Sequence, residues 1–181
     1  MPEEDYEFTP HSRLMQPEEI ESLAKLFVDN GVSKIRLTGG EPLVRKDSAD
    51  IILRLAKLPV KLTLTTNATR LHDFVNVLEE AKVSSLNISL DTLDSDKFNI
   101  ITRRDSFKKV MDNIHLMIDR NFHVKVNVVV MKGMNEHEIN DFVAWTKDVP
   151  VHVRFIEFMP FEGNRWTSNQ VFTWKEMLEE I

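Results

Sequence analysis

The sequence predicts an α/β fold in which about five parallel strands form a curved, partial barrel. Segments with apolar residues at helical spacing alternate along the chain with short segments in which apolar and polar residues alternate. Strands separated by helices favour a parallel sheet with right-handed crossovers. Strands covered on both faces read as continuous apolar runs, and these do not. We therefore expect helices on one face of the sheet and a polar hollow on the other.

Local start and stop signals place the elements in order. Gln16-Pro17-Glu18-Glu19 starts a first helix, with proline and acids in the first turn, and Asn30-Gly31 ends it. Thr173 is a plausible N-cap of the last helix, with Glu176 three residues on. Further helices are expected from apolar stripes at 51–58, 71–78, 107–118 and 139–143, and strands at 34–37, 61–65, 85–89, 124–130 and 151–156.

Composition indicates one globular domain over residues 1–181. Apolar residues make up 42% and charged residues 29% of the chain, as in ordinary soluble proteins. No window reaches the roughly 20 apolar residues of a membrane span, and no secretory signal is visible. The net charge of -6 argues against general nucleic-acid binding. We expect neither nucleic acid nor membrane as a partner.

The chain contains no cysteine and 6 histidines. This composition excludes disulfides, thiolate catalysis and iron–sulfur ligation by the residues of this chain. No two histidines have the spacing of a helical metal site, so isolated surface or core histidines are expected and no metal ligand is assigned.

The polar positions of the predicted strands carry charge of one sign. Arg36, Lys125 and Arg154 are cationic, His152 can become so, and no acid shares their strand faces. A basic interior in an acidic protein indicates an anionic ligand, and phosphate suits these donors best. The alternative is a sheet with one face open to solvent.

A glycine turn follows the first strand, in the sequence Thr38-Gly39-Gly40-Glu41-Pro42. Two glycines allow the backbone to approach a ligand closely, and Pro42 fixes the exit of the chain. The carboxyl end of a strand is where α/β proteins usually bind small molecules. A tight loop without a ligand is the alternative.

Several segments, in order along the chain, resemble the molybdenum cofactor biosynthesis protein A family, which are radical S-adenosylmethionine GTP 3′,8-cyclases. They are residues 35–43, 65–67, 87–93, 124–127 and 154–160. The resemblance implies a partial (β/α)6 TIM-like barrel of the radical SAM type, here truncated, with a 4Fe-4S cluster that binds S-adenosylmethionine and a second cluster that holds GTP. It implies conversion of GTP into the cyclic pyranopterin precursor, by removal of the ribose 3′ hydrogen and attack on C8 of guanine.

The resemblance also implies roles for single residues. Gly40 matches a contact to the methionine end of S-adenosylmethionine, Ser89 a ribose or carboxylate contact, and Met159 a backbone site near adenine. Gly39, Glu41 and Asn67 are expected to be neighbours of the cofactor. Arg36, Thr65 and Lys125 match contacts to GTP.

The chain departs from the family pattern in two places. The cluster loop of three cysteines precedes a segment like Met1-Pro2-Glu3-Glu4 in the family, and this chain has none of those cysteines. We therefore expect a domain that is incomplete at both ends, inactive alone and exposed at one sheet edge, which invites self-association. Ala68 stands where the family usually has glycine.

Arg103-Arg104 and residues 160–166 resemble the eukaryotic branch of the family. The implied location is the cytoplasm, or the mitochondrial matrix for a eukaryotic protein, and the longer parent is expected to be a homodimer.

Three other functions remain open at this point. The chain could be a cluster-free nucleotide-binding module, or a member of a different radical SAM family. A barrel lyase acting on a sugar phosphate would have to find its acid–base pair among Glu41, Asp91 and His152.

Overall fold

The computed structural model describes residues 9–10, 13–160 and 167–181, and the described part contains one five-stranded parallel sheet. The strand order β1-β2-β3-β4-β5 follows the sequence, so each strand pairs only with its neighbours along the chain. The predicted α/β class with parallel strands is confirmed. The strands are β1 (Lys34–Leu37), β2 (Lys61–Thr66), β3 (Ser85–Ser89), β4 (Val124–Val130) and β5 (His152–Glu157).

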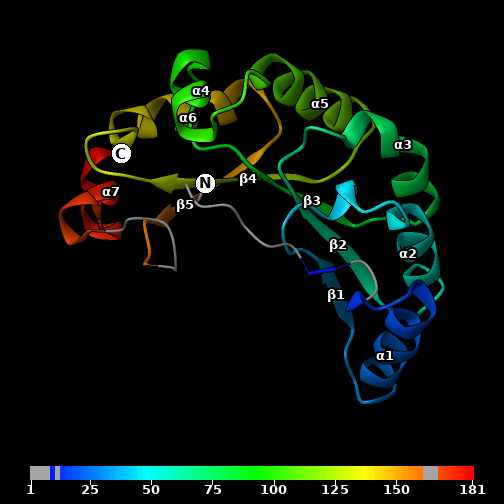
Figure 1. The fold of residues 1–181 in the computed structure, drawn as a ribbon. Coiled ribbons are helices and arrows are strands. Elements are labelled where there is room, and N and C mark those ends of the chain that lie inside the picture. Colours follow the sequence, from blue (N-terminus) through cyan, green and yellow to red (C-terminus); the bar gives the residue numbers. More distant parts are fainter. Residues whose placement is uncertain (1–8, 11–12, 161–166) are drawn as a thin grey trace.

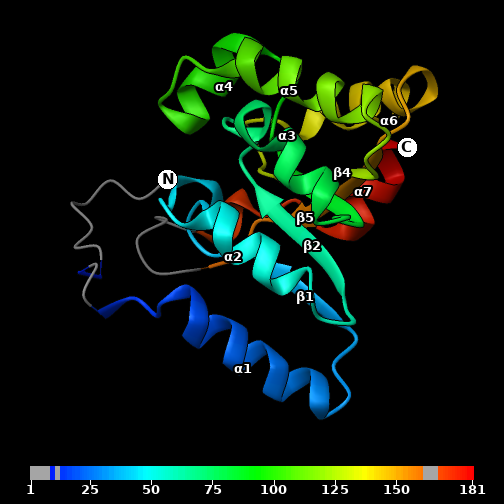
Figure 2. The same ribbon diagram turned by 90° about the vertical axis from the view of Figure 1, so that its right-hand side faces the viewer.

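The helices follow the outer side of the curved sheet and leave its inner side open (Figure 1). Viewed from the side, α2 and α3 lie over β1 and β2, and α5 continues the outer layer (Figure 2). The helices are α1 (Pro17–Asp29), α2 (Ser48–Leu55), α3 (Leu71–Glu80), α4 (Ser95–Thr102), α5 (Phe107–Asp119), α6 (Ile139–Asp148) and α7 (Trp174–Glu180); short 3-10 turns occur at Pro42–Val44, Glu136–Glu138 and Ser168–Gln170.

The helix-end signals read from the sequence are confirmed. The backbone N–H of Gln16 donates to Glu19 Oε2 at 2.7 Å, which closes a capping box at the start of α1. Gly31, at φ 95°, continues the chain after the end of α1 in a conformation that favours glycine. The N–H of Thr173 donates to Glu176 Oε2 at 2.8 Å and starts α7 in the same way.

Helix α4 is an element that the sequence analysis did not predict. It is short and buries mainly Phe98, which packs edge-to-face on Phe107 with ring centroids 5.6 Å apart. Asp94 caps it by accepting a hydrogen bond from the N–H of Lys97 at 2.8 Å. A single buried aromatic residue produces no apolar stripe, so periodicity alone did not indicate this helix.

The core lies between the sheet and the outer helices. Val124, Val126 and Val128, which alternate along β4, are each at most 1% exposed. Residues between them in the strand point to the opposite face, because strand side chains alternate strictly. The predicted division into an apolar outer face and a polar inner face is confirmed.

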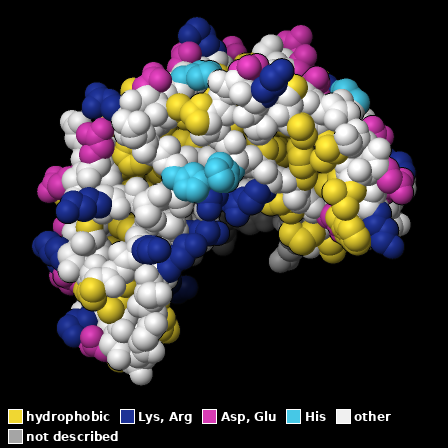
Figure 3. Space-filling model, turned by 180° about the vertical axis from the view of Figure 1, so that it is seen from behind, with side chains coloured by type: hydrophobic (Ala, Val, Ile, Leu, Met, Phe, Trp, Pro, Cys, Tyr) yellow, Lys and Arg dark blue, Asp and Glu magenta, His cyan; other side chains and the backbone are white. Residues whose placement is uncertain are grey.

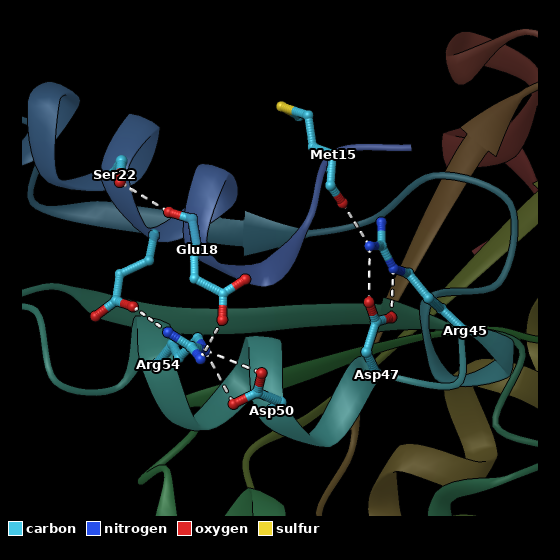
Figure 4. A network of polar contacts seen from close by, with 8 residues as sticks. Met15, Glu18, Ser22, Arg45, Asp47, Asp50 and Arg54 are labelled. Atoms are coloured by element: carbon cyan, nitrogen blue, oxygen red, sulfur yellow. Dashed lines mark hydrogen bonds and ion pairs between the residues drawn. The ribbon is translucent and has the colours of Figure 1, made fainter. Parts of the chain in front are cut away.

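A cluster of ion pairs joins α1 to α2. The Arg54 guanidinium contacts Glu18 and Glu21 of α1 and, at 2.9 Å, Asp50 within α2 (Figure 4). Nearby, Arg45 pairs with Asp47 and donates to the carbonyl oxygen of Met15. These contacts fix the segment that follows the glycine turn.

Among the strands of the described part of the chain, β1 is one edge of the sheet and pairs only with β2. Beside it, α1 leaves an apolar groove of about 330 Å³, in which Phe27 remains 53% exposed. The groove is lined by Ile20, Leu23, Ala24, Phe27, Val32, Ile35, Leu37 and Leu55. Self-association through this edge stays a prediction.

Candidate functional site

Polar side chains from all five strands lie on the inner face in rows across the sheet. The register pairs Arg36 with Thr63, and Lys125 with both Asn87 and His152. Because paired residues share a face, Arg36 and Lys125 lie on the same side of the sheet. The rows are Arg36–Thr63–Ser85, Thr65–Asn87–Lys125–His152 and Ser89–Asn127–Arg154.

Long cationic side chains from the outer strands reach over short neutral ones in the middle of the sheet. Arg154 Nη2 donates to Asn87 Oδ1 at 2.9 Å, and Arg36 Nε donates to Thr63 Oγ1 at 3.4 Å. Asn87 is fully buried as a result. Lys and Arg side chains follow the hollowed side of the molecule in a band (Figure 3). The hollow therefore has a neutral floor beneath a cationic rim, which suits an anionic ligand.

The glycine turn is held against the end of β2 by Glu41. Its Oε1 accepts from the hydroxyl of Thr66 at 2.7 Å and from the N–H of Leu43 at 3.1 Å, and its Oε2 accepts from the N–H of Asn67 at 2.7 Å. Both oxygens are thus engaged within the protein. Glu41 fixes the shape of the turn, and Gly39, at φ 121°, allows the bend.

The residues matched to S-adenosylmethionine gather at the carboxyl edge of the sheet. Gly39 and Gly40 follow β1, Asn67 follows β2, Ser89 ends β3, and Met159 lies two residues beyond β5, where it is 61% exposed. The residues matched to GTP, which are Arg36, Thr65 and Lys125, lie within the strands. The two predicted groups therefore occupy different levels along the same strands. Residues 161–166, which carry part of the resemblance, lie outside the described part, as does Met1-Pro2-Glu3-Glu4.

Two observations at this edge fit a small polar cofactor. A Cβ added at Gly40 would meet nothing within 4 Å, so space is open beside the turn. On the inner face of β4, the buried Oδ1 of Asn127 has no hydrogen-bond partner within the described residues. A buried polar atom without a partner is costly, and a bound polar group next to this amide would allow it to pair.

The position of Ala68 explains why glycine suits it. Ala68 has φ 63°, in the left-handed region, and it is fully buried. Its carbonyl oxygen accepts from Asn113 Nδ2 at 2.7 Å, and its N–H donates to Thr66 Oγ1 at 3.1 Å, so the surrounding contacts hold this backbone in place. A Cβ in this conformation costs roughly 1–2 kcal/mol, which glycine avoids.

Replacing Ala68 with glycine is expected to stabilise the fold by about 0.5–1 kcal/mol, because relief of the left-handed strain exceeds the lost burial of one methyl group. Urea unfolding of both proteins measures the difference. Ala81→Gly is the matched control, since Ala81 is also buried but has φ -72°. It should lose about 1 kcal/mol. Equal losses in both variants would show that the conformation of Ala68 is not strained.

The predicted acid–base candidates are not brought together. Asp91 Oδ1 accepts from the N–H of Val129 at 2.8 Å; burial raises the pKa of the Asp91 carboxyl, and that hydrogen bond opposes the rise. Glu41 is engaged at the end of β2, and His152 packs on His123. No hydrogen bond or ion pair joins any two of Glu41, Asp91 and His152 in the part that the structure describes. The geometry gives the lyase no acid–base pair.

Sequence reasoning missed two groups. The expectation of isolated histidines is wrong for His123 and His152, whose rings pack with centroids 4.6 Å apart. Glu138 is only 4% exposed and accepts hydrogen bonds from the loop after β3. Both groups depend on residues that are far apart in the sequence.

No group of three or more His, Cys, Asp or Glu side chains that could hold a metal ion occurs within residues 9–10, 13–160 and 167–181. The residues present therefore do not fit an iron–sulfur cluster, whose usual ligands are thiolates. Over the same ranges, none of the helices has the length and apolar character of a membrane span.

A curved parallel sheet with a glycine turn at its carboxyl edge and helices on its outer side defines a partial α/β barrel. A family model described as the radical SAM superfamily matches residues 2–146. The chain belongs to the radical SAM superfamily.

Curated relatives match along the whole chain. Molybdenum cofactor biosynthesis protein 1 of Homo sapiens is 49% identical over 100% of this chain and 29% of its own length. The mitochondrial GTP 3′,8-cyclase of Arabidopsis thaliana is 47% identical over 100% of this chain and 47% of its own length. The GTP 3′,8-cyclase of Listeria welshimeri is 42% identical over 97% of this chain and 52% of its own length. The chain thus spans about half, or less, of the curated relatives it matches.

A solved structure shows the same fold. The structure of anSMEcpe with bound AdoMet has a TM-score of 0.70 and 22% identity, over 90% of this chain and 46% of that one. At this identity the likeness supports the architecture and nothing finer.

Proposed function

We propose that this chain is the nucleotide- and cofactor-binding core of a GTP 3′,8-cyclase. The observation that carries the proposal is the hollow itself, where cations of several strands share one face and no acid occurs on that face in the described strands. A triphosphate is a polyanion that such a rim can bind. The names of the Arabidopsis and Listeria relatives support GTP as the nucleotide.

In this proposal the two levels of the sheet bind two molecules. Gly40, Ser89 and Met159 hold S-adenosylmethionine at the carboxyl edge, with Gly39, Glu41 and Asn67 shaping the turn around it. When bound, S-adenosylmethionine supplies the radical chemistry of the superfamily. Deeper in the hollow, Arg36, Thr65 and Lys125 bind and orient GTP.

The residues of this chain bind and orient the two molecules but contribute no thiolate, because the chain has no cysteine. The complete conversion of GTP into the cyclic pyranopterin precursor is therefore proposed for the longer protein that the relatives represent. A mitochondrial location and homodimerisation belong to the same proposal. The first is supported by the name of the Arabidopsis relative.

Lys125→Ala is expected to weaken GTP binding by about tenfold or more, because a charge-assisted contact to phosphate is lost. Titration calorimetry of this chain with GTP measures the change. Lys109→Ala, which removes an exposed lysine from the outer helix α5, is the matched control and should bind as the unsubstituted chain does. Binding of S-adenosylmethionine should stay the same in both variants.

Equal GTP affinity in the Lys125→Ala and Lys109→Ala proteins would show that Lys125 is not part of the GTP site.

The second candidate function is a cluster-free nucleotide-binding module, which the absence of cysteine favours. Calorimetry with GTP and S-adenosylmethionine separates the two candidates. Iron analysis after anaerobic reconstitution tests what they share: a stoichiometric, reducible cluster on this chain would contradict the assignment of no cluster ligand to its residues.

A further inference from the structure

A pair of histidines lies at the amino-terminal end of the hollow. His123 immediately precedes β4, and His152 opens β5 as the register partner of Lys125. Their rings pack edge-to-face, with centroids 4.6 Å apart and planes at 61°. Both side chains are exposed. Histidine side chains lie next to the band of Lys and Arg side chains on the hollowed side (Figure 3).

Among the strand residues that the structure describes, the charges on the face of this pair are all positive. On their own strands they are Lys125 and Arg154. The inner face of β3 presents only uncharged Ser85, Asn87 and Ser89, and the inner faces of β1 and β2 add only cations to the hydroxyls of Thr63 and Thr65. The cations of this face are Lys34, Arg36, Lys61, Lys125 and Arg154.

The surroundings of His123 disfavour the protonated form of its ring. Partial loss of solvation lowers the pKa of the exposed His123 ring below its ordinary value of 6.5, and the neighbouring His152 and Lys125 lower it further. A phosphate oxygen beside the rings has the opposite effect, since it favours the protonated form and can accept a hydrogen bond from it. Binding of phosphate would then be accompanied by uptake of protons.

The levels of the sheet indicate which part of the ligand reaches the pair. The cofactor-matched residues lie at the carboxyl edge, so the reacting part of the nucleotide must face that edge. Lys125 lies nearer the amino-terminal end of β4 than that edge does. The two histidines lie at the amino-terminal ends of β4 and β5. If the reacting part of the nucleotide faces the carboxyl edge, its triphosphate extends the other way, past Lys125 and toward the two histidines.

We infer that His123 and His152 form a protonation-dependent subsite for the terminal phosphate of the nucleoside triphosphate bound in the hollow. The inference rests on the proposed function. It adds two residues, His123 and His152, and a pH dependence, neither of which is part of that function. The bound state holds more protons than the free state. Affinity is therefore greatest at low pH and falls as the pH rises through the pKa of His123 in the complex.

The test compares GTP binding by calorimetry at about pH 6 and about pH 8. The double variant His123→Gln, His152→Gln is expected to bind GTP about tenfold more weakly than the unsubstituted chain near pH 6, with little difference near pH 8. The terminal phosphate of GTP itself titrates in this pH range. The affinities of the variants are therefore compared with each other at the same pH, where this contribution is equal. His115→Gln, on the exposed face of α5, is the control and should leave both affinities unchanged.

Calorimetry in buffers of different ionisation enthalpy adds a count of the protons taken up, which should be smaller in the double variant. Inorganic tripolyphosphate should show the same dependence on the histidines, and guanosine should show none. The single variant His152→Gln, at an exposed position, should show part of the effect and serves if the double variant does not fold.

The outcomes separate this inference from the proposed function. If GTP does not bind the unsubstituted chain, both are overturned. If GTP binds and depends on Lys125, but its pH dependence is the same in the histidine variants, only the histidine subsite is overturned. A loss of guanosine binding that matches the loss of GTP binding would also overturn the assignment to phosphate.

Discussion

Glu138→Ala is expected to lower the free energy of unfolding by about 3 kcal/mol, because it leaves several buried donors without an acceptor. Glu138 Oε1 lies 2.6 Å from Lys97 Nζ, and both carboxylate oxygens accept from Thr92 Oγ1, at 2.9 and 2.8 Å. Its Oε2 also accepts from the N–H of Leu93 at 2.8 Å. One side chain at the start of α6 thereby holds the loop that follows β3.

Denaturant unfolding of the unsubstituted and Glu138→Ala chains measures this loss. Glu80→Ala, at an exposed position of α3, is the control and should change stability by less than about 0.5 kcal/mol. Lys97 is 23% exposed at its side chain and can turn to water, which keeps the expected loss at the lower end for a broken buried pair. A loss below about 1 kcal/mol would mean that water replaces the carboxylate.

Phe142→Ala is expected to destabilise the fold by about 3–5 kcal/mol through the cavity it leaves. Phe142, on α6, is 1% exposed and packs edge-to-face on Phe155 of β5, with ring centroids 6.2 Å apart. It also packs edge-to-face on the Trp145 ring, with ring centroids 6.3 Å apart. Removing the ring takes away this packing between α6 and β5, the strand that carries Arg154 and His152.

The measurement is again unfolding in denaturant, with Val143→Ala as the neighbouring control. Val143 is 36% exposed, so its truncation should cost well under 1 kcal/mol. Near-equal losses at the two positions would show that α6 does not depend on the aromatic contact. Phe142→Leu should retain much of the stability, because a large apolar side chain still fills part of the space.

The strands and their faces could be predicted from the sequence because alternation is a local property. The bounds expected for 34–37, 85–89 and 124–130 match the structure. Helix α4 was missed because its burial rests mainly on Phe98 and its partner Phe107 lies in the next helix. Tertiary contact decides such a short element, whereas local periodicity does not.

The sequence predicts which side chains of the site share one face of the sheet. It does not predict which of them contact each other. Which residues share the inner face follows from strand parity, so the presence of Arg36 and Lys125 on one face could be expected. The donors that bond to Glu41 could not be predicted, because Thr66 and Asn67 lie 25 and 26 residues further along the chain. The contact between His123 and His152 likewise depends on the register of β4 with β5.

The order of the strands has a consequence for how the chain is made. Because β1 to β5 pair strictly in sequence order, no strand waits for a distant segment before it finds its neighbour. Each strand can join the existing edge as soon as it has left the ribosome, at the cost of closing only the helical crossover that precedes it. The half-barrel is thus suited to growing in one direction during translation, one βα unit after another.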